Sequence, residues 1–116
     1  MLSEHVPFYD NAEHAYDELG RRNVDRLYCF AVDDFSDDDW RQLGEGYERL
    51  PGWLGPGTEG SFQGCPCWFG LDPAAGSHLS ASVEPPGIQV AGRLTDDELS
   101  EWHESFLLLT RLFPRA

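Results

Sequence analysis

Lysine is absent from this chain of 116 residues, so eight arginines supply all of its strongly basic groups. Against them stand 21 acidic residues, and the formal net charge is -13. A surface of that sign repels the phosphates of nucleic acids and of anionic membranes, whereas it attracts cationic proteins. We therefore expect a basic protein as the partner, and we exclude direct binding to nucleic acid or to a membrane.

Cysteine and long apolar runs are scarce as well. The three cysteines are an odd number and suggest no disulfide framework, which agrees with a reducing compartment. No apolar run approaches the ~18 residues of a membrane span, and the first residues lack the basic and apolar regions of a signal peptide. From these absences we expect a cytoplasmic protein.

The residues that are present suffice for one hydrophobic core. Hydrophobic residues make up 41% of the chain and aromatic residues 13%, so the acidic composition does not imply disorder. The chain shows no internal repeat and no linker. We expect residues 1–116 to form a single domain.

Apolar residues at helical spacing predict three amphipathic helices. Two of them begin with a capping-box pattern, in which a Ser or Thr is followed three residues later by an acidic residue. These pairs are Ser36 with Asp39 and Thr95 with Glu98. The predicted helices span residues 11–22, 36–50 and 95–113.

Short apolar or alternating runs predict four strands, at residues 26–32, 61–71, 78–83 and 88–93. A turn at residues 85–87 joins the last two strands, which therefore form an antiparallel hairpin. Pro66 suggests an edge position or a bulge in its strand. Residues 50–60 are rich in glycine and proline, and we expect them to form a loop without regular structure.

Taken in chain order, these elements predict an α+β fold with the order α-β-α-β-β-β-α. We expect an antiparallel sheet of about four strands, packed by two or three helices. From residue 36 onward this order superficially matches that of a double-stranded RNA-binding domain. That function is excluded by charge, because such domains hold phosphates with basic residues, which are few and dispersed here.

Five carboxylates crowd into seven residues where a predicted strand meets a helix, at Asp33, Asp34, Asp37, Asp38 and Asp39. Acidic residues in the first helical turn complement the helix dipole and the unpaired amides, which accounts for three of the five. The others either present a negative surface to a basic cleft or chelate a hard cation. An EF-hand is not indicated, because neither its spacing nor its closing glutamate is present.

Cys65 and Cys67 form a second group of chemically reactive residues, to which His78 and His103 could add ligands for zinc. A single residue separates the cysteines, whereas structural zinc sites usually have two to four. In a strand, both sulfurs would lie on one face, which equally suits two buried apolar side chains. These four residues are therefore weak metal candidates, and we expect no cofactor. Cys29 is expected in the core.

Trp53 stands in the glycine- and proline-rich segment. An aromatic residue in such a position either pins the loop to the core or serves as an anchor at an interface. The sequence leaves both interpretations open.

A hairpin over residues 79–90, followed by a helix that carries Trp102 and Phe106, resembles the immunity proteins of bacterial polymorphic and contact-dependent toxin systems. The resemblance implies a non-enzymatic protein that neutralises a cognate toxin, such as a nuclease or a nucleic-acid deaminase with a basic cleft. Acidic residues would speed the encounter and aromatic residues would hold the complex. The expected contact residues are Asp33, Asp34, Asp37, Asp38, Glu45, Glu48 and Trp53.

Two other functions are compatible with the sequence. One is a small thiol- or zinc-dependent protein centred on Cys65, Cys67 and His78. The other is a structural subunit that oligomerises through its C-terminal helix, because residues 106–109 are apolar on nearly all sides. The sequence does not settle the oligomeric state.

Overall fold

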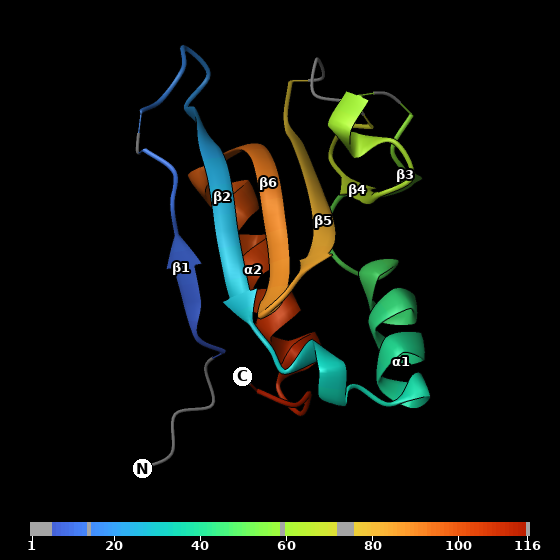
Figure 1. Cartoon of the computed structure of the whole chain (residues 1–116). Helices are drawn as coiled ribbons and strands as arrows, with labels where there is room; N and C mark the ends of the chain where they lie inside the picture. Colours follow the sequence, from blue (N-terminus) through green and yellow to red (C-terminus); the bar gives the residue numbers. More distant parts are fainter. Residues whose placement is uncertain (1–5, 14, 59, 72–75, 116) are drawn as a thin grey trace.

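Six antiparallel strands form one sheet, in the order β1-β2-β6-β5-β4-β3 (Figure 1). The computed structural model describes residues 6–13, 15–58, 60–71 and 76–115. The strands are β1 (Phe8–Asp10), β2 (Arg21–Cys29), β3 (Trp53–Pro56), β4 (Pro66–Trp68), β5 (His78–Glu84) and β6 (Gly87–Thr95). Two α-helices, α1 (Asp37–Tyr47) and α2 (Asp96–Thr110), and two short 3-10 helices, η1 (Val32–Asp34) and η2 (Gly60–Phe62), complete the described part of the chain.

The predicted hairpin is confirmed as the centre of the sheet. Strands β5 and β6 pair from His78 opposite Arg93 to Glu84 opposite Gly87, and a turn of two prolines joins them. Strand β2 pairs with the other edge of β6 along its whole length. Gly87 is required there, because a Cβ atom at this position would collide with the backbone of Tyr28.

The core lies between the sheet and α2, which crosses the back of the sheet in Figure 1. Alternate residues of the central strands face this helix, as the two-residue period of a strand requires. Trp102 and Phe106 of α2 are fully buried and stack with ring centroids 4.8 Å apart. The ring centroid of the buried Trp68 lies 5.1 Å from that of Trp102. The indole Nε1 of Trp68 donates a hydrogen bond to the carbonyl oxygen of Tyr47 at 3.0 Å. Aromatic packing therefore ties α2, β4 and α1 into one core.

Both predicted capping boxes are confirmed. The hydroxyl of Ser36 accepts from the N–H of Asp39 at 3.0 Å, and the Asp39 carboxylate accepts from the N–H of Ser36 at 2.9 Å. Thr95 and Glu98 make the same pair of bonds at the start of α2. Helix α1 ends at Tyr47 and α2 at Thr110, so each is shorter than its predicted range.

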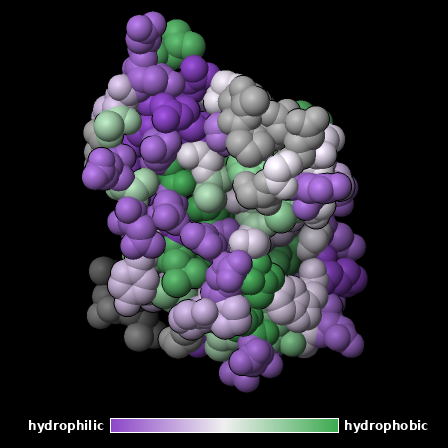
Figure 2. Space-filling view, turned by 45° about the horizontal axis from the view of Figure 1, so that its top comes forward, coloured by the Kyte–Doolittle hydropathy of each residue, from purple (hydrophilic) through white to green (hydrophobic). Residues whose placement is uncertain are grey.

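The face of the sheet turned away from α2 carries no α-helix in the described residues, although Phe62 of η2 packs on His78 there. Its central side chains, such as Asp25, Leu27, Gln89 and Ala91, are half-buried. Figure 2 shows hydrophilic residues at the end of the molecule that carries the connection between β1 and β2, and hydrophobic residues among polar ones lower on the same face. Such a mixture is typical of an antiparallel sheet with one solvated face.

The prediction of about four strands and two or three helices was wrong, because the sheet has six strands and the described residues form two α-helices. The helix predicted over residues 11–22 does not form. Instead, the Asp17 carboxylate accepts bonds at 2.9 Å from the N–H groups of Leu19 and Arg21, which closes a turn before β2. Asp side chains that bond nearby amides in this way compete with the helix.

The other differences concern short strands that depend on their neighbours. Residues 50–60, expected to be a loop, contain β3, which pairs with β4 through an irregular register at Gly55. The strand predicted over residues 61–71 is reduced to the three residues of β4, preceded by η2. Strands β1 and β4 form because the longer strands β2 and β5 offer them hydrogen bonds, and β3 in turn pairs with β4. Local sequence patterns do not contain that information.

Neither α2 nor α1 meets the length and hydropathy that crossing a bilayer demands, and this holds for the described residues only.

Candidate functional site

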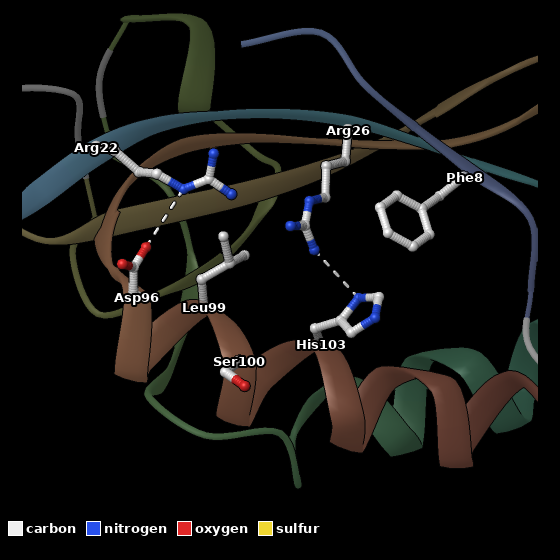
Figure 3. Close-up of a pocket in the computed structure, with 7 residues that line it drawn as sticks. All are labelled: Phe8, Arg22, Arg26, Asp96, Leu99, Ser100 and His103. Carbon is white, nitrogen blue, oxygen red and sulfur yellow. Dashed lines mark hydrogen bonds and ion pairs between the residues drawn. The ribbon is translucent and has the colours of Figure 1, made fainter. Parts of the chain in front are cut away.

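Two regions with several charged side chains stand out in the described part of the chain. The first, which we call the arginine pocket, is a cavity of about 210 Å³ between β1, β2 and α2 (Figure 3). It is lined by Phe8, Arg22, Arg26, Asp96, Leu99, Ser100 and His103. The second, which we call the acidic segment, consists of Asp33, Asp34, Asp37, Asp38, Glu45 and Glu48.

Strand and helix periods explain why these side chains meet in the arginine pocket. Residues 22, 24, 26 and 28 alternate along β2, which directs both arginines toward α2. On α2 the lining residues are 96, 99, 100 and 103, and because 99 and 100 each lie three or four positions from 96 and from 103, all four share one face. Figure 3 shows both guanidinium groups on the β2 side, with Leu99, Ser100 and His103 opposite them on α2.

Asp10 of β1 links the two arginines. Its Oδ2 atom lies 3.3 Å from Nη2 of Arg22 and 3.1 Å from Nε of Arg26. The side chain of Arg22 is only 5% exposed and that of Arg26 only 11%. Desolvation acts to raise the pKa of Asp10, but the hydrogen bonds and charges of Arg26 and Arg22 outweigh it and lower that pKa. Asp10 is therefore ionised at neutral pH and shares its charge between two buried cations.

The remaining donors of Arg22 are poorly satisfied. Its Nε atom lies 3.6 Å from Oδ1 of Asp96, which is an ion pair but too long for a hydrogen bond. Both Nε and Nη1 are buried, and neither has a hydrogen-bond partner among the residues that the structure describes. Leaving a buried donor without an acceptor costs about 1–3 kcal/mol, and more for a charged group. The arginine pocket thus holds a cation whose hydrogen-bonding capacity is largely unused.

Arg26 reaches the imidazole of His103. The Nδ1 atom of His103 lies 3.2 Å from Nη1 of Arg26 and 2.7 Å from the hydroxyl of Tyr28. Because a guanidinium group can only donate, Nδ1 is the acceptor in this contact. The guanidinium also lies 4.8 Å from the ring centroid of Phe8, a distance suited to a cation–π interaction. Burial raises the pKa of Tyr28, so its hydroxyl stays protonated and can donate.

The acidic segment follows the chain from η1 through α1. All six carboxylates belong to exposed residues. Arg41 binds two of them, Asp38 and Glu45, with Nη1 at 2.8 Å from Glu45, and its hydrogen bonds lower the pKa of Asp38. Of the described residues, none forms an ion pair or a side-chain hydrogen bond with the four others, which are Asp33, Asp34, Asp37 and Glu48.

Trp53 is the seventh predicted contact residue. It does not belong to the acidic segment, because it lies on β3, after the end of α1. It is half-buried, with its ring centroid 5.7 Å from that of Trp68. The structure therefore favours the role of an anchor that holds β3 against the core over that of an exposed contact.

The cysteines and histidines do not gather into one site. His103 lies in the arginine pocket, whereas the ring of His78 packs 5.4 Å from Phe62. In the parts of the chain that the structure describes, no group of three His, Cys, Asp or Glu residues is arranged to hold a metal ion. Burial raises the pKa of the Cys67 thiol to about 11, which keeps it protonated and a poor nucleophile at neutral pH. Cys29 is half-buried and not in the core, because β2 directs it away from α2.

The arginine pocket was missed at the level of sequence. The helix predicted over residues 11–22 ended at Arg22 and so separated this residue from the strand that carries it. The sequence does contain a pattern that indicates a strand here. Every second position from 22 to 28 belongs to one face, which carries Arg22, Val24, Arg26 and Tyr28. Charged residues at alternate positions are normally assigned to a solvated face, and here they face a helix.

Comparison with known proteins found no counterpart of this chain: no family model matches it, and neither does any curated protein or solved structure. The function is therefore argued from the geometry and charge of the two regions.

Proposed function

We propose that this chain is an immunity-type inhibitor, which binds and neutralises a basic bacterial toxin through its acidic segment. The observation that carries the proposal is the set of exposed carboxylates that have no side-chain partner among the described residues, namely Asp33, Asp34, Asp37 and Glu48. A nuclease or a nucleic-acid deaminase is a suitable target, because its cleft is basic and the carboxylates would occupy the places of substrate phosphates.

Helix stability does not account for the whole acidic segment. Acidic residues in the first turn of α1 do stabilise the helix, and Asp37, Asp38 and Asp39 stand there. Glu45 and Glu48 lie at the other end, where the helix dipole disfavours a negative charge, and the last turn holds no basic residue. Acidic residues that oppose the dipole are better explained by what they bind than by what they stabilise.

The arrangement suits rapid capture of a partner. The capping box at Ser36 fixes the start of α1, and the twelve residues from Asp37 to Glu48 span about 16 Å along the helix axis. Carboxylates held along such a length present one elongated negative surface. Complementary charges of this kind raise the association rate and make it sensitive to salt.

Co-expression with the product of the neighbouring reading frame tests this function. We expect the neighbour to be toxic alone and harmless together with the wild-type chain. A variant with Asp33→Asn, Asp34→Asn, Asp37→Asn and Glu48→Gln should lose most of the protection. The matched control changes four other exposed acids, Glu13, Glu18, Glu101 and Glu104, to Gln and should protect fully. A harmless neighbour, or equal protection by both variants, would contradict the proposal.

A second candidate function is self-association through the C-terminal helix. Leu108 is 67% exposed and Leu112 is 86% exposed, although both are large apolar residues. Light scattering at increasing protein concentration distinguishes the two functions, because self-association predicts a rise in mass that Leu108→Gln abolishes. An inhibitor that acts as a monomer predicts a constant mass.

A further inference from the structure

The arginine pocket has no part in the proposed inhibition. It contains two of the eight arginines of a chain whose net charge is -13, and both are withdrawn from solvent. Burying a guanidinium group is costly unless its donors are satisfied. An arrangement that keeps two such groups beside a cavity therefore calls for an explanation of its own.

Arg22 supplies the strongest observation. Within the described part of the chain, Nη2 of Arg22 is hydrogen-bonded to Asp10, while Nε and Nη1 have no hydrogen-bond partner. Native proteins satisfy nearly all buried polar groups, and the exceptions commonly mark a place for a water, an ion or a ligand. Arg22 also lines the cavity, so an acceptor bound there comes next to a cation that lacks one.

The other walls limit the kind of acceptor. Phe8 and Leu99 are apolar, and the hydroxyl of the exposed Ser100 offers one more polar contact. A volume of about 210 Å³ corresponds to the liquid volume of about seven waters. The cavity therefore suits a small molecule with a short apolar part better than a nucleotide or a folded peptide segment.

We propose that the arginine pocket binds a small organic carboxylate, with its carboxylate group at Arg22 and Arg26 and its apolar part against Phe8 and Leu99. A planar carboxylate matches the fork of a guanidinium group and forms charge-assisted bonds with it. A single negative charge suits the site better than the double charge of phosphate, because Asp10 and Asp96 already offset the two arginines.

Asp96 competes with this ligand for Arg22. Its carboxylate stands at the rim of the cavity, 3.6 Å from Nε, and the hydroxyl of Tyr16 donates to it at 3.0 Å. An incoming carboxylate must approach against that charge. Replacing Asp96 with Asn should therefore strengthen binding, which a purely structural role of the pocket does not predict.

Titrations followed by NMR chemical shifts test the proposal at constant ionic strength. The probes are sodium acetate, sodium benzoate, sodium phosphate and the neutral benzamide. We expect saturable shifts at Ser100 and His103 with the two carboxylates and none with benzamide or phosphate. Arg26→Gln should weaken benzoate binding about tenfold or more, because it removes one charge-assisted donor. Arg111→Gln, which changes an exposed arginine outside the pocket, should leave binding unaltered.

Arg26→Gln also removes the ion pair with Asp10, so this variant could fail to fold. A second variant therefore tests the proposal independently. Ser100→Phe places a large side chain at the mouth of the cavity from an exposed helical position, and it should abolish the shifts in a folded protein. The proposal is overturned if neither carboxylate gives saturable shifts, if benzamide or phosphate binds as well as benzoate, or if Ser100→Phe binds benzoate like the wild type. The result does not depend on a toxin, so it stands apart from the inhibitor proposal.

Discussion

The acidic segment and the arginine pocket hold charges of opposite sign, and they also differ in how those charges relate to folding. Arg22 and Arg26 are shielded from water and bound to Asp10, a residue of another strand, so their interactions depend on the tertiary fold. The acids of the segment are exposed and interact, where they do so at all, with neighbours on the same helix. Charge in the pocket is thus coupled to stability, and charge on the segment is available to a partner.

The largest expected effect comes from Asp10→Asn. This change leaves two buried guanidinium groups without their shared carboxylate, and breaking a buried ion pair in this way costs about 3 kcal/mol or more. Urea unfolding at neutral pH measures the loss. Asp33→Asn is the matched control in the acidic segment and should change the free energy of unfolding by less than about 0.5 kcal/mol. Equal effects of the two substitutions would remove the contrast between the regions.

Lowering the pH should show that the stability contributed by the pocket depends on the charge of Asp10. The folded protein lowers the pKa of Asp10, so its ionised form contributes stability at neutral pH that is lost as the pH falls below about 4. The Asp10→Asn variant lacks this contribution and should lose less stability between pH 7 and pH 3 than the wild type. Urea midpoints measured at both pH values check the prediction, and parallel losses in the two proteins would refute it.

Capping is a feature that the two regions share, because a capping box begins α1 as well as α2. Ser36→Ala and Thr95→Ala should each cost about 1 kcal/mol, since each removes an acceptor for an otherwise unpaired N–H group. Thermal unfolding of the two variants measures this. A loss at Thr95 without one at Ser36 would mean that α1 is not held in place by its cap, and that the acidic segment lacks a fixed geometry.

The smallest effect is expected for Glu48→Gln. The negative charge of Glu48 at the C-terminal end of α1 opposes the helix dipole, so its removal should stabilise the protein by a few tenths of a kcal/mol, up to about 0.5. Urea unfolding at low salt offers the best sensitivity, because salt screens this interaction. A destabilisation of about 1 kcal/mol would show that Glu48 has a structural role.

The two regions also differ in how far the sequence predicts them. The acidic segment was predictable because a capping box and an amphipathic stripe are local patterns, and both are present at Ser36 and in α1. Its six acidic residues lie at these local features and are exposed, and their role as contact residues stays a prediction. The sequence predicts Trp53 as a contact because it does not distinguish an aromatic residue that packs on the core from one that faces a partner, and in the structure Trp53 is half-buried against Trp68.

The arginine pocket depends on pairing between distant segments, and local patterns do not specify that pairing. Strand β1 has only three residues, all exposed, and it forms because β2 offers it an edge. Asp17 turns the chain before β2, where helical spacing predicted a continuous helix. Without β1 and the full length of β2, neither Asp10 nor Arg22 could be placed next to α2.

The central claim, that the acidic segment draws in a basic partner, is tested most directly by the rate of association with the toxin. Stopped-flow measurements compare the wild type, the variant with neutral residues at 33, 34, 37 and 48, and the control with neutral residues at 13, 18, 101 and 104. Both variants lose four negative charges. The account predicts that the first associates about tenfold more slowly and loses most of its salt dependence, while the control stays close to the wild type. Equal rates for the two variants would show that only the net charge matters, and would contradict the account.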